Sequence, residues 1–481
     1  KQSLGGEEIV EDQKSPTTET SEHNTQSQAL FSADGKRLMH AWSELSSNAN
    51  QKRSLPSTSK MQAFLQALAT PLPLTFRIRR RSKHSQSSDS NQELQKHVQE
   101  MFGGWIGEIA LQANTALPTN STSNVIYQAK RINQQQQQLV LSKTNLGHVA
   151  PKLKAWLMEN STNGNIARQE LGSMLPVLLL SQAFAGKDDE NASVSGDSDK
   201  SGWMRLGSRV LDLCASPGSK TLQALEVIGP TGRIKANDIN ASRLESLREA
   251  VQRAQVPNSN RVKYTNVDAS QFPIPTQDSK FFDVILCDVP CSGDGTIRKD
   301  AHILPNWTPQ TSNALHSLQV RILVRAIQCL KVGGVMCYST CSLNPMENEA
   351  VVNAALSRIA ALKRPCIQAE LLPIPSWPGL SLRPGVKQWK VADFVYNDGN
   401  GSNSDAVPDD DGNDDDDSEI PRLKWYNTYQ DAMDSKTTMA HAVRTLWPPE
   451  KDDYGLERCG RLWPEDHDSG GFFVALIRRT K

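Results

Sequence analysis

Two cysteines stand where thiol chemistry is possible. Cys291 ends the segment DVPC at 288–291 and Cys341 lies in STCS at 339–342, each directly after an apolar run typical of a strand. Thiolates are strong nucleophiles, and two thiols at neighbouring strand ends can divide attack on a substrate and release of the product between them. We therefore treat Cys341 and Cys291 as candidate catalytic residues.

Two less reactive roles for cysteine are open as well. Cys287 and Cys337 lie inside VILCD and VMCYS, where cysteine serves as a small apolar residue of a strand. The spacings Cys287-x3-Cys291 and Cys337-x3-Cys341 also resemble paired zinc hooks. Structural zinc pairs usually sit on tight turns, whereas the first member of each pair here belongs to a strand. We expect no metal.

A cofactor site is indicated by three further strand ends. The turn after the first strand candidate contains Gly218, which allows close backbone approach, and Ser219, which can cap the following helix. The spacing is not GxGxxG, so a dinucleotide is disfavoured. Asp238, after the second strand, can accept both hydroxyls of a ribose, and Asp268, after the third, can meet an adenine edge. Each Asp could also be a helix cap, but together they favour S-adenosylmethionine. The candidate cofactor-binding residues are Cys214, Ala215, Ser216, Pro217, Gly218, Ser219, Lys220, Asp238, Asp268 and Asp288.

A methyl donor beside two thiols suggests one reaction. Carbon 5 of cytosine is a poor nucleophile, and addition of a thiolate at carbon 6 makes carbon 5 reactive. Asp288 is placed to recognise the ring nitrogen and the exocyclic amine, and Lys220 to contact the base or lower a thiol pKa, although a lysine at a helix start is often only solvated.

The elements around these residues alternate between strand and helix. We expect strands in SRVLDLC, GRIKANDI, RVKYTNVD, FDVILCD, GVMCYST and GGFFVALIRR, with helices such as ASRLESLREAVQRA between them. This alternation predicts an α/β fold with a doubly wound, Rossmann-like sheet over residues 171–481, with loop inserts at 185–201 and 398–419.

The remaining chain predicts a lead-in and a smaller domain. Residues 1–59 are rich in Ser, Thr, Gln and Asn and are expected to be disordered. Residues 60–170 are expected to form an α+β domain with a helix in MQAFLQALA and a strand in LTFRIRR. Residues 152–180, which cross the end of this domain, are expected to be helical in KLKAWLME and NIARQELGSMLPVLLL. The tract Gln134 to Gln138 is expected to be a loop insertion. The basic cluster comprises Arg77, Arg79, Arg80, Arg81 and Lys83, and is either a solvated face or a phosphate-binding patch.

The composition places limits on the function. The 53 basic and 53 acidic residues cancel, but residues 187–199 and 398–419 carry fifteen of the acids. The other 446 residues hold 52 basic against 38 acidic side chains, so polyanions remain candidate partners. No apolar run is long enough to cross a membrane, and eight cysteines are too few for a disulfide scaffold. KQSLGGEEIV shows no secretory pattern, and we expect a trimmed fragment in a reducing compartment.

Six motifs in one order resemble the Sun/Nop family of RNA cytosine-5 methyltransferases. They are LDLCASPGSKT at 211–221, ANDIN at 236–240, VDAS at 267–270, DVPCSGDGT at 288–296, YSTCSLNPMENEAVV at 338–352 and GGFFVA at 470–475. The chain resembles the eukaryotic tRNA branch in particular, through GNIARQELGSMLPVLLL, CSGDGTIRKD, GVKQWKV and LERCGRL.

The resemblance implies a class I methyltransferase sheet and a role for each motif residue. It makes Cys341 the nucleophile and Cys291 the residue that helps release the product, with S-adenosylmethionine held by the 214–220 loop, Asp238, Asp268 and Asp288. It also implies that the N-terminal domain binds RNA, with tRNA as the first candidate, with no obligate protein partner, and in the nucleus or nucleolus or else the cytoplasm. Ser216 stands where the family more often has Ala.

Two other functions remain open at this point. The same chemistry could act on rRNA or DNA, although in DNA enzymes of this type the cysteine of the PC motif attacks, so the second thiol at Cys341 argues against DNA. A non-catalytic RNA-binding or assembly factor could also keep the fold, but it would be expected to lose a thiol or the Gly218 loop.

Overall fold

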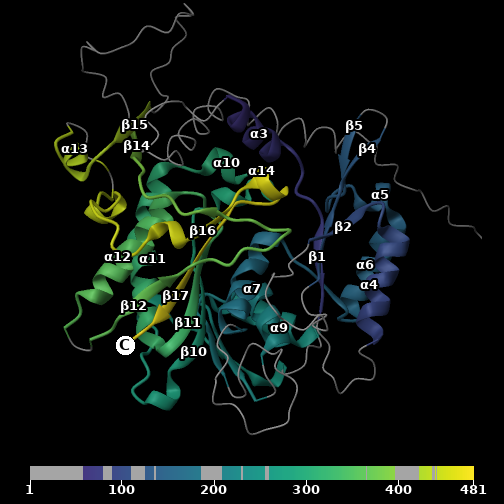
Figure 1. Cartoon of the computed structure of the whole chain (residues 1–481), viewed down its shortest axis with the longest axis horizontal. Coiled ribbons are helices and arrows are strands. Elements are labelled where there is room, and N and C mark those ends of the chain that lie inside the picture. Colours follow the sequence, from purple (N-terminus) through teal and green to yellow (C-terminus); the bar gives the residue numbers. More distant parts are fainter. Residues whose placement is uncertain are drawn as a thin grey trace, which may run out of the picture.

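The computed structural model describes residues 58–79, 89–109, 125–134, 137–185, 208–228, 231–254, 259–363, 366–395, 422–435, 439 and 441–481. These residues form a four-stranded sheet near the N-terminus and a nine-stranded sheet that follows it (Figure 1). The predicted lead-in and the two acidic inserts fall almost entirely outside the described residues, so the disorder expected of the lead-in remains a prediction.

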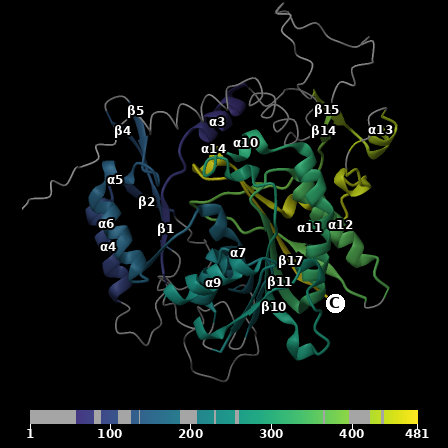
Figure 2. The same cartoon turned by 180° about the vertical axis from the view of Figure 1, so that it is seen from behind.

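The smaller sheet is antiparallel, with the order β2-β3-β1-β6. Its strands are β1 (Thr75–Ile78), β2 (Ile106–Ile109), β3 (Ile126–Ala129) and β6 (Ile166–Arg168). The helices α4 (Asp89–Phe102), α5 (Leu146–Val149) and α6 (Pro151–Thr162) lie on the side that faces away from the large sheet (Figures 1 and 2). Phe76 stacks on Tyr127 with ring centroids 5.3 Å apart and lies 5.9 Å from the ring of Trp156, which forms an aromatic core between strands and helices.

Two expectations for this part of the chain are wrong. The segment 165–180 was expected to be helical throughout, but residues 166–168 pair with β1 as strand β6, and the helix α7 (Leu171–Ala185) begins only afterwards. The glutamine tract was expected to be a loop, but Gln134 and Gln137 pair in the hairpin of β4 (Arg131–Gln134) and β5 (Gln137–Val140). In both places pairing with a neighbouring strand overrides the local pattern.

The large sheet has the strand order β13-β16-β17-β11-β10-β7-β8-β9, and β12 also pairs with β17. Strands β7 to β11 are parallel, whereas β17 runs antiparallel between β11 and β16. The predicted Rossmann-like sheet is therefore confirmed. Its strands are β7 (Arg209–Asp212), β8 (Arg233–Asn237), β9 (Val262–Thr265), β10 (Phe282–Asp288), β11 (Leu330–Thr340), β12 (Ala369–Leu372), β13 (Arg383–Pro384), β16 (Gly460–Leu462) and β17 (Phe472–Arg479).

Helices cover both faces of this sheet and create two cores. Alternate residues of β10 enter different cores, with Ile285 and Cys287 on one face and Val284 and Leu286 on the other. The first core includes residues of α3 (Thr58–Ala69), α11 (Pro309–Cys329) and α12 (Glu349–Ala360), and the second includes residues of α7, α8 (Ser219–Val227) and α9 (Ala241–Arg253). Two-sided burial explains why these strands read as continuous apolar runs.

The remaining elements are short. They are the pair β14 (Val391–Val395) and β15 (Arg422–Tyr426), helices α10 (Ile303–Asn306), α13 (Tyr429–Met433) and α14 (Pro464–His467), and 3-10 turns that include η4 (Asp294–Thr296) and η5 (Pro345–Glu347). Among the described helices, none combines the length and the apolar character needed to cross a membrane.

Two residues of the basic cluster, Arg77 and Arg79, lie in the part of the chain that the structure describes, and both have a structural role. Arg77 is buried and makes two hydrogen bonds to Glu226 on α8, and Arg79 is buried with its Nε 3.4 Å from the same carboxylate. These two arginines therefore join the two sheets and are not available to RNA, because their charge is already paired. Arg80, Arg81 and Lys83 lie outside the described residues.

Candidate active site

The two candidate thiols lie together at the carboxyl edge of the large sheet. Strands β10 and β11 are parallel neighbours with Asp288 opposite Ser339, so the chain leaves both strands at the same edge. The sulfur atoms of Cys291 and Cys341 are 3.2 Å apart, and both side chains are half-buried. The cysteines that stay inside the strands, Cys287 and Cys337, enter opposite cores, so the four thiols do not converge on one ion.

The surroundings of Cys291 keep its thiol protonated. The pKa of Cys291 lies well above its ordinary value, because of the hydrogen bond to Cys341 and then because of burial and the neighbouring carboxylate of Glu347. A thiol with a raised pKa keeps its proton at neutral pH, and either sulfur can donate in this contact.

Asp288 and Lys220 form an ion pair beside the thiols. The Nζ of Lys220 is 2.7 Å from Asp288 Oδ2, and the hydroxyl of Ser339 donates to Asp288 Oδ1 at 2.6 Å. Lys220 also donates to Ser173 Oγ at 3.2 Å and lies over the ring of Phe472. Burial acts to lower the pKa of Lys220, but the charge and hydrogen bond of Asp288 raise it above the ordinary value. Lys220 is thus a fixed cation of the site, and the alternative of a merely solvated lysine is wrong.

The loop after β7 has the tight geometry that its glycine suggested. Gly218 adopts φ +108° at the start of α8, and a Cβ there would lie 2.3 Å from Leu247 Cδ1. Gly218 is itself the residue that precedes the helix, and Ser219 is its first helical residue, so the expected cap by Ser219 is wrong. Ala215 and Ser216 are buried and Pro217 is exposed, while burial raises the pKa of the Cys214 thiol.

The aspartates at the next two strand ends are held by backbone amides. Asp238 is buried and accepts from the N–H groups of Ser216 at 3.1 Å and Asn240 at 2.9 Å. Asp268 accepts from the N–H of Ser270 at 2.8 Å and begins a short 3-10 turn. Asp268 is therefore also the cap that the sequence allowed, whereas the cap of α9 is Asn240 and not Asp238. Each of the two carboxylates keeps lone pairs for a further partner.

Two residues of this edge escaped the sequence reasoning. Asn237 donates to the carbonyls of Leu213 and Val267 at 3.0 and 2.9 Å, so its amide joins three consecutive strand ends. Ile239, next to Asp238, leaves 67% of its surface exposed and offers an apolar contact beside the carboxylate. An isoleucine directly after the acidic residue at a predicted strand end was the sequence signal that could have identified Ile239.

Glu347 is the third residue that was missed. Its carboxylate is fully buried and accepts hydrogen bonds from Ser292 N at 2.9 Å, Ser342 Oγ at 2.9 Å and Gln319 Nε2 at 3.0 Å, as well as from two further hydroxyls. Ser292 and Ser342 directly follow the two thiols, so one carboxylate fixes the chain after both. Two glutamates close together directly before the apolar run AVV, in PMENEAVV, were the available signal.

Two buried polar atoms at the cofactor loop have no hydrogen-bond partner among the described residues. They are Asp212 Oδ1 and Ser216 Oγ. The other oxygen of Asp212 accepts from Thr221 Oγ1 at 2.6 Å, and burial raises the pKa of Asp212 to about 7. Buried polar atoms without partners carry a desolvation cost, and a polar ligand bound at this loop would satisfy them.

Comparison with known proteins agrees with this geometry. Residues 204–371, which include both thiols and the loop at Gly218, match the family model described as 16S rRNA methyltransferase RsmB/F. Within the α/β domain, residues 204–371 are thus similar to this methyltransferase family. The resemblance indicated by the six motifs is thereby confirmed.

Relatives of the methyltransferase domain extend the similarity to most of the chain. The chain is 30% identical to the multisite-specific tRNA:(cytosine-C(5))-methyltransferase trm4b of Schizosaccharomyces pombe, over 88% of this chain and 56% of that protein. It is 33% identical to the tRNA (cytosine(34)-C(5))-methyltransferase of Drosophila melanogaster, over 72% of this chain and 41% of that protein. The chain thus spans about half the length of the curated relatives it matches.

Solved structures show the same fold. A methyltransferase homolog protein from Pyrococcus horikoshii aligns over 94% of this chain and 98% of its own, with a TM-score of 0.51 and 20% identity. The crystal structure of NSun6 from Pyrococcus horikoshii with SFG aligns over 93% and 98%, with a TM-score of 0.50 and 16% identity. Both alignments include the N-terminal unit as well as the methyltransferase domain.

Proposed function

We propose that this protein transfers a methyl group from S-adenosylmethionine to carbon 5 of cytosine in RNA, and that tRNA is its main substrate. The observation that carries the proposal is the pair of sulfurs, 3.2 Å apart, beside the ion pair of Asp288 and Lys220. Two adjacent thiols beside a carboxylate that can bind the base fit a reaction in which one thiol adds to a pyrimidine ring. The family match and the two relatives named as tRNA cytosine-C5 methyltransferases support the same chemistry.

The cofactor loop fits S-adenosylmethionine. Asp238 and Asp268 are the candidates for the ribose and adenine, Ile239 offers an apolar surface to a base, and the unpartnered Ser216 Oγ and Asp212 Oδ1 are candidates for the polar amino-acid part. When bound, the cofactor supplies the electrophilic methyl group. No dinucleotide pyrophosphate loop is present in the 214–220 segment, so a nucleoside cofactor suits the site better.

The residues of the chain activate the base. Asp288 has lone pairs left to accept an N–H of the exocyclic amine, and the third N–H of Lys220 can be donated to a ring acceptor. The thiolate of Cys341 adds to carbon 6, a sulfur–carbon bond forms, and the electron pair of the C5–C6 double bond becomes available at carbon 5.

Cys291 acts in the release of the product. Cys291 has to give up its own proton to solvent, which its raised pKa makes the costly part of this step, and its thiolate then accepts the proton from carbon 5. The C5–C6 double bond forms again as the bond between carbon 6 and Cys341 breaks, and Cys341 leaves as a thiolate. The two sulfurs are close enough for both to act on adjacent ring carbons.

The target cytosine has to leave its stack to reach these thiols. Extrusion costs roughly a few kcal/mol and is least costly for an unpaired base, so loop or junction cytosines are the expected targets. Ribosomal RNA is the second candidate substrate, because a 189-residue stretch is 39% identical to the ribosomal RNA small subunit methyltransferase F of Serratia proteamaculans.

The proposed reaction is tested with labelled S-adenosylmethionine and separate tRNA and rRNA fractions. Cys341→Ala is expected to give neither label transfer nor a covalent protein–RNA adduct. Cys291→Ala is expected to accumulate the adduct, because addition occurs and release fails. An adduct in Cys341→Ala and none in Cys291→Ala would reverse the two roles. Absence of label in every RNA with the unaltered protein would leave the non-catalytic RNA-binding function as the better explanation.

We further propose that the N-terminal unit contacts RNA and that the protein acts in the nucleus or nucleolus. Support for both comes from the family resemblance alone. Deletion of residues 60–170 would unpair Glu226, so RNA binding is better tested by crosslinking the intact protein to tRNA and mapping the crosslinked peptides. Fluorescence imaging of the tagged protein tests the compartment, and a purely cytoplasmic signal would contradict that part.

A further inference from the structure

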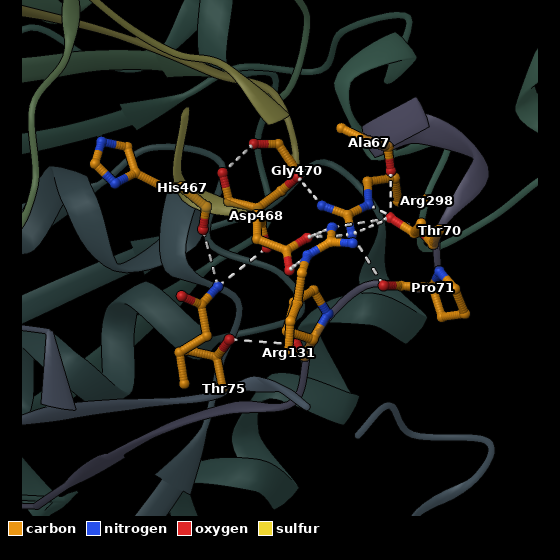
Figure 3. A network of polar contacts seen from close by, with 12 residues as sticks. Ala67, Thr70, Pro71, Thr75, Arg131, Arg298, His467, Asp468 and Gly470 are labelled. Atoms are coloured by element: carbon orange, nitrogen blue, oxygen red, sulfur yellow. Dashed lines mark hydrogen bonds and ion pairs between the residues drawn. The ribbon is translucent and has the colours of Figure 1, made fainter. Parts of the chain in front are cut away.

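Arg298 joins three separate parts of the chain at the end of the loop that carries Cys291. Its side chain is completely buried, with an exposed fraction of 0%. The guanidinium donates from Nε to the carbonyl of Thr70 at 3.0 Å, from Nη1 to the carbonyl of Ser469 at 2.8 Å, and from Nη2 to the carbonyl of Pro71 at 2.9 Å (Figure 3). Nη2 also lies 2.6 Å from the carboxylate of Asp468. Only a planar group with several fixed N–H donors can serve so many acceptors at once.

Asp468 is the counter-ion of this cluster and links it to the N-terminal unit. It follows α14 in a left-handed conformation with φ +49°, and its carboxylate accepts two hydrogen bonds of 2.8 Å from Arg131 at the start of β4. The carbonyl of Asp468 accepts from Gln128 Nε2 at 3.0 Å. Figure 3 shows that the guanidinium groups of Arg131, on β4, and of Arg298, at the end of the loop that carries Cys291, approach the same carboxylate of Asp468.

Backbone hydrogen bonds connect the turn at Asp468 to Cys341. Gly471, three residues after Asp468, donates to the carbonyl of Gly295 at 2.7 Å, and the N–H of Gly295 donates to the carbonyl of Cys341 at 2.9 Å. Gly295 lies between Cys291 and Arg298 in one loop, residues 288–298. Both thiols are thereby attached to one hydrogen-bonded unit, whose other end Arg298 fastens to the Asp468 turn and to the segment before β1.

We infer that Arg298 is a positioning residue that holds Cys291 in register with Cys341 and makes this register depend on the docked N-terminal segment. The role in catalysis rests on the proposed function, whereas the effect on the distance between the thiols does not. Arg298 is too far along the chain from the thiols to react itself, and its buried charge is matched by Asp468. An arginine that only stabilised the fold would not have to fasten the loop of the reacting cysteine.

The alternative is that Arg298 only adds stability. The two roles differ in what they change in folded molecules. Loss of stability alone lowers the folded fraction and leaves each folded molecule with unaltered thiols and an unaltered kcat. Loss of positioning separates the thiols in molecules that are still folded, and lowers kcat while the KM for S-adenosylmethionine stays the same, because the cofactor loop does not contact Arg298.

Arg298→Gln and Asp468→Asn test the inference. Asn tolerates the left-handed conformation of residue 468, so Asp468→Asn removes the charge without straining the turn. Arg298→Lys keeps the charge but cannot serve all the acceptors. Arg383→Gln is the matched control, because Arg383 binds Glu465 and Asp466 on the neighbouring α14 without touching the 288–298 loop.

The first measurement reads the thiols without any RNA. The azo oxidant diamide takes two hydrogen atoms from two adjacent thiols, which become a disulfide while diamide becomes a hydrazine. Peptide mass spectrometry follows the bond between Cys291 and Cys341 with time. Arg298→Gln and Asp468→Asn are expected to slow it about 10-fold or more, Arg298→Lys by less, and Arg383→Gln not at all.

The second measurement is the kinetics of methyl transfer. Arg298→Gln is expected to lower kcat about 10-fold to 100-fold, as for a displacement on the order of 1 Å, with an unchanged KM for S-adenosylmethionine. A thermal melt establishes the folded fraction, and if Arg298→Gln does not fold, the other two variants decide. Unaltered rates of disulfide formation in folded variants would overturn the inference. If the unaltered protein transfers no methyl group, the proposed function fails, and the disulfide measurement still decides the role of Arg298.

Discussion

Substitution of Gly295 by alanine gives the sharpest prediction for the site. Gly295 lies between the backbones of Cys341 and Gly471, and a Cβ on it would be 2.4 Å from the carbonyl oxygen of Gly471 and 2.7 Å from that of Cys341. The φ of Gly295 is not in the left-handed region, so alanine meets no conformational penalty there and the effect is purely steric.

The size of the effect follows from these distances. Real Cβ atoms essentially never approach closer than 3.0 Å, so the oxygen of Gly471 has to recede by about 0.6 Å and that of Cys341 by about 0.3 Å. Neither is a flexible side-chain end, so the strand ends of β11 and β17 have to separate. Overpacking of this kind costs roughly 1 to 3 kcal/mol of folding free energy. A shift of the nucleophile approaching 1 Å lowers kcat about 10-fold to 100-fold.

The assay compares Gly295→Ala with Gly104→Ala. A Cβ on Gly104 meets no atom within 4 Å, so this variant is expected to match the unaltered protein. Urea unfolding gives the change in folding free energy, and methyl transfer to tRNA gives kcat for the folded fraction. If Gly295→Ala folds with unaltered stability and transfers methyl groups at the rate of the unaltered protein, the close backbone packing behind Cys341 is not what holds the nucleophile.

Three further predictions test the buried charges. Glu347→Ala leaves several buried donors unpaired and is expected to destabilise the protein by about 3 kcal/mol or more, whereas Glu347→Gln keeps some acceptors and should cost less in urea unfolding. Asp212 has its pKa raised from 3.8 to about 7, so its contribution to stability is complete below pH 3.8 and is lost as pH rises through about 7. Asp212→Asn should therefore flatten the decline of the unfolding free energy across that window; an unaltered decline would show that another group causes it. Arg77→Met removes both hydrogen bonds that the buried Glu226 accepts from Arg77 and leaves only Arg79 nearby, so it should cost about 3 kcal/mol, against less than about 0.5 kcal/mol for Lys96→Met, whose ion pair on α4 is exposed. Equal costs for these last two would refute the joining role of Arg77.

The proximity of the two candidate catalytic cysteines could be predicted from the sequence because the sheet is parallel. Parallel strands end at one edge, so Cys291 and Cys341, after two apolar runs, had to lie near each other once the strands were neighbours. The same argument placed Asp238 and Asp268 at the cofactor edge. Local strand and helix patterns were enough for these predictions, because each depends only on where a strand ends.

What the local pattern missed depends on partners far away in the chain. Arg77 belongs to a basic cluster whose composition resembles a nucleic-acid-binding patch. In the folded chain, however, its guanidinium is paired with Glu226, 149 residues later, and is buried between the two sheets. Nothing in the segment IRKD separates Arg298 from its neighbours, yet the approach of Asp468, 170 residues away, buries it completely.

The sequence by itself therefore determined the chemistry of this protein, and the tertiary structure decided its mechanics. Residue types at strand ends define which groups can react, because the periodicity of a strand is local. Packing of segments that are distant in sequence decides the distance between the two thiols, the raised pKa of Cys291 and the attachment of both thiols to the N-terminal unit. Such contacts arise only when the whole chain has folded, since burial and long-range ion pairing have no local signature.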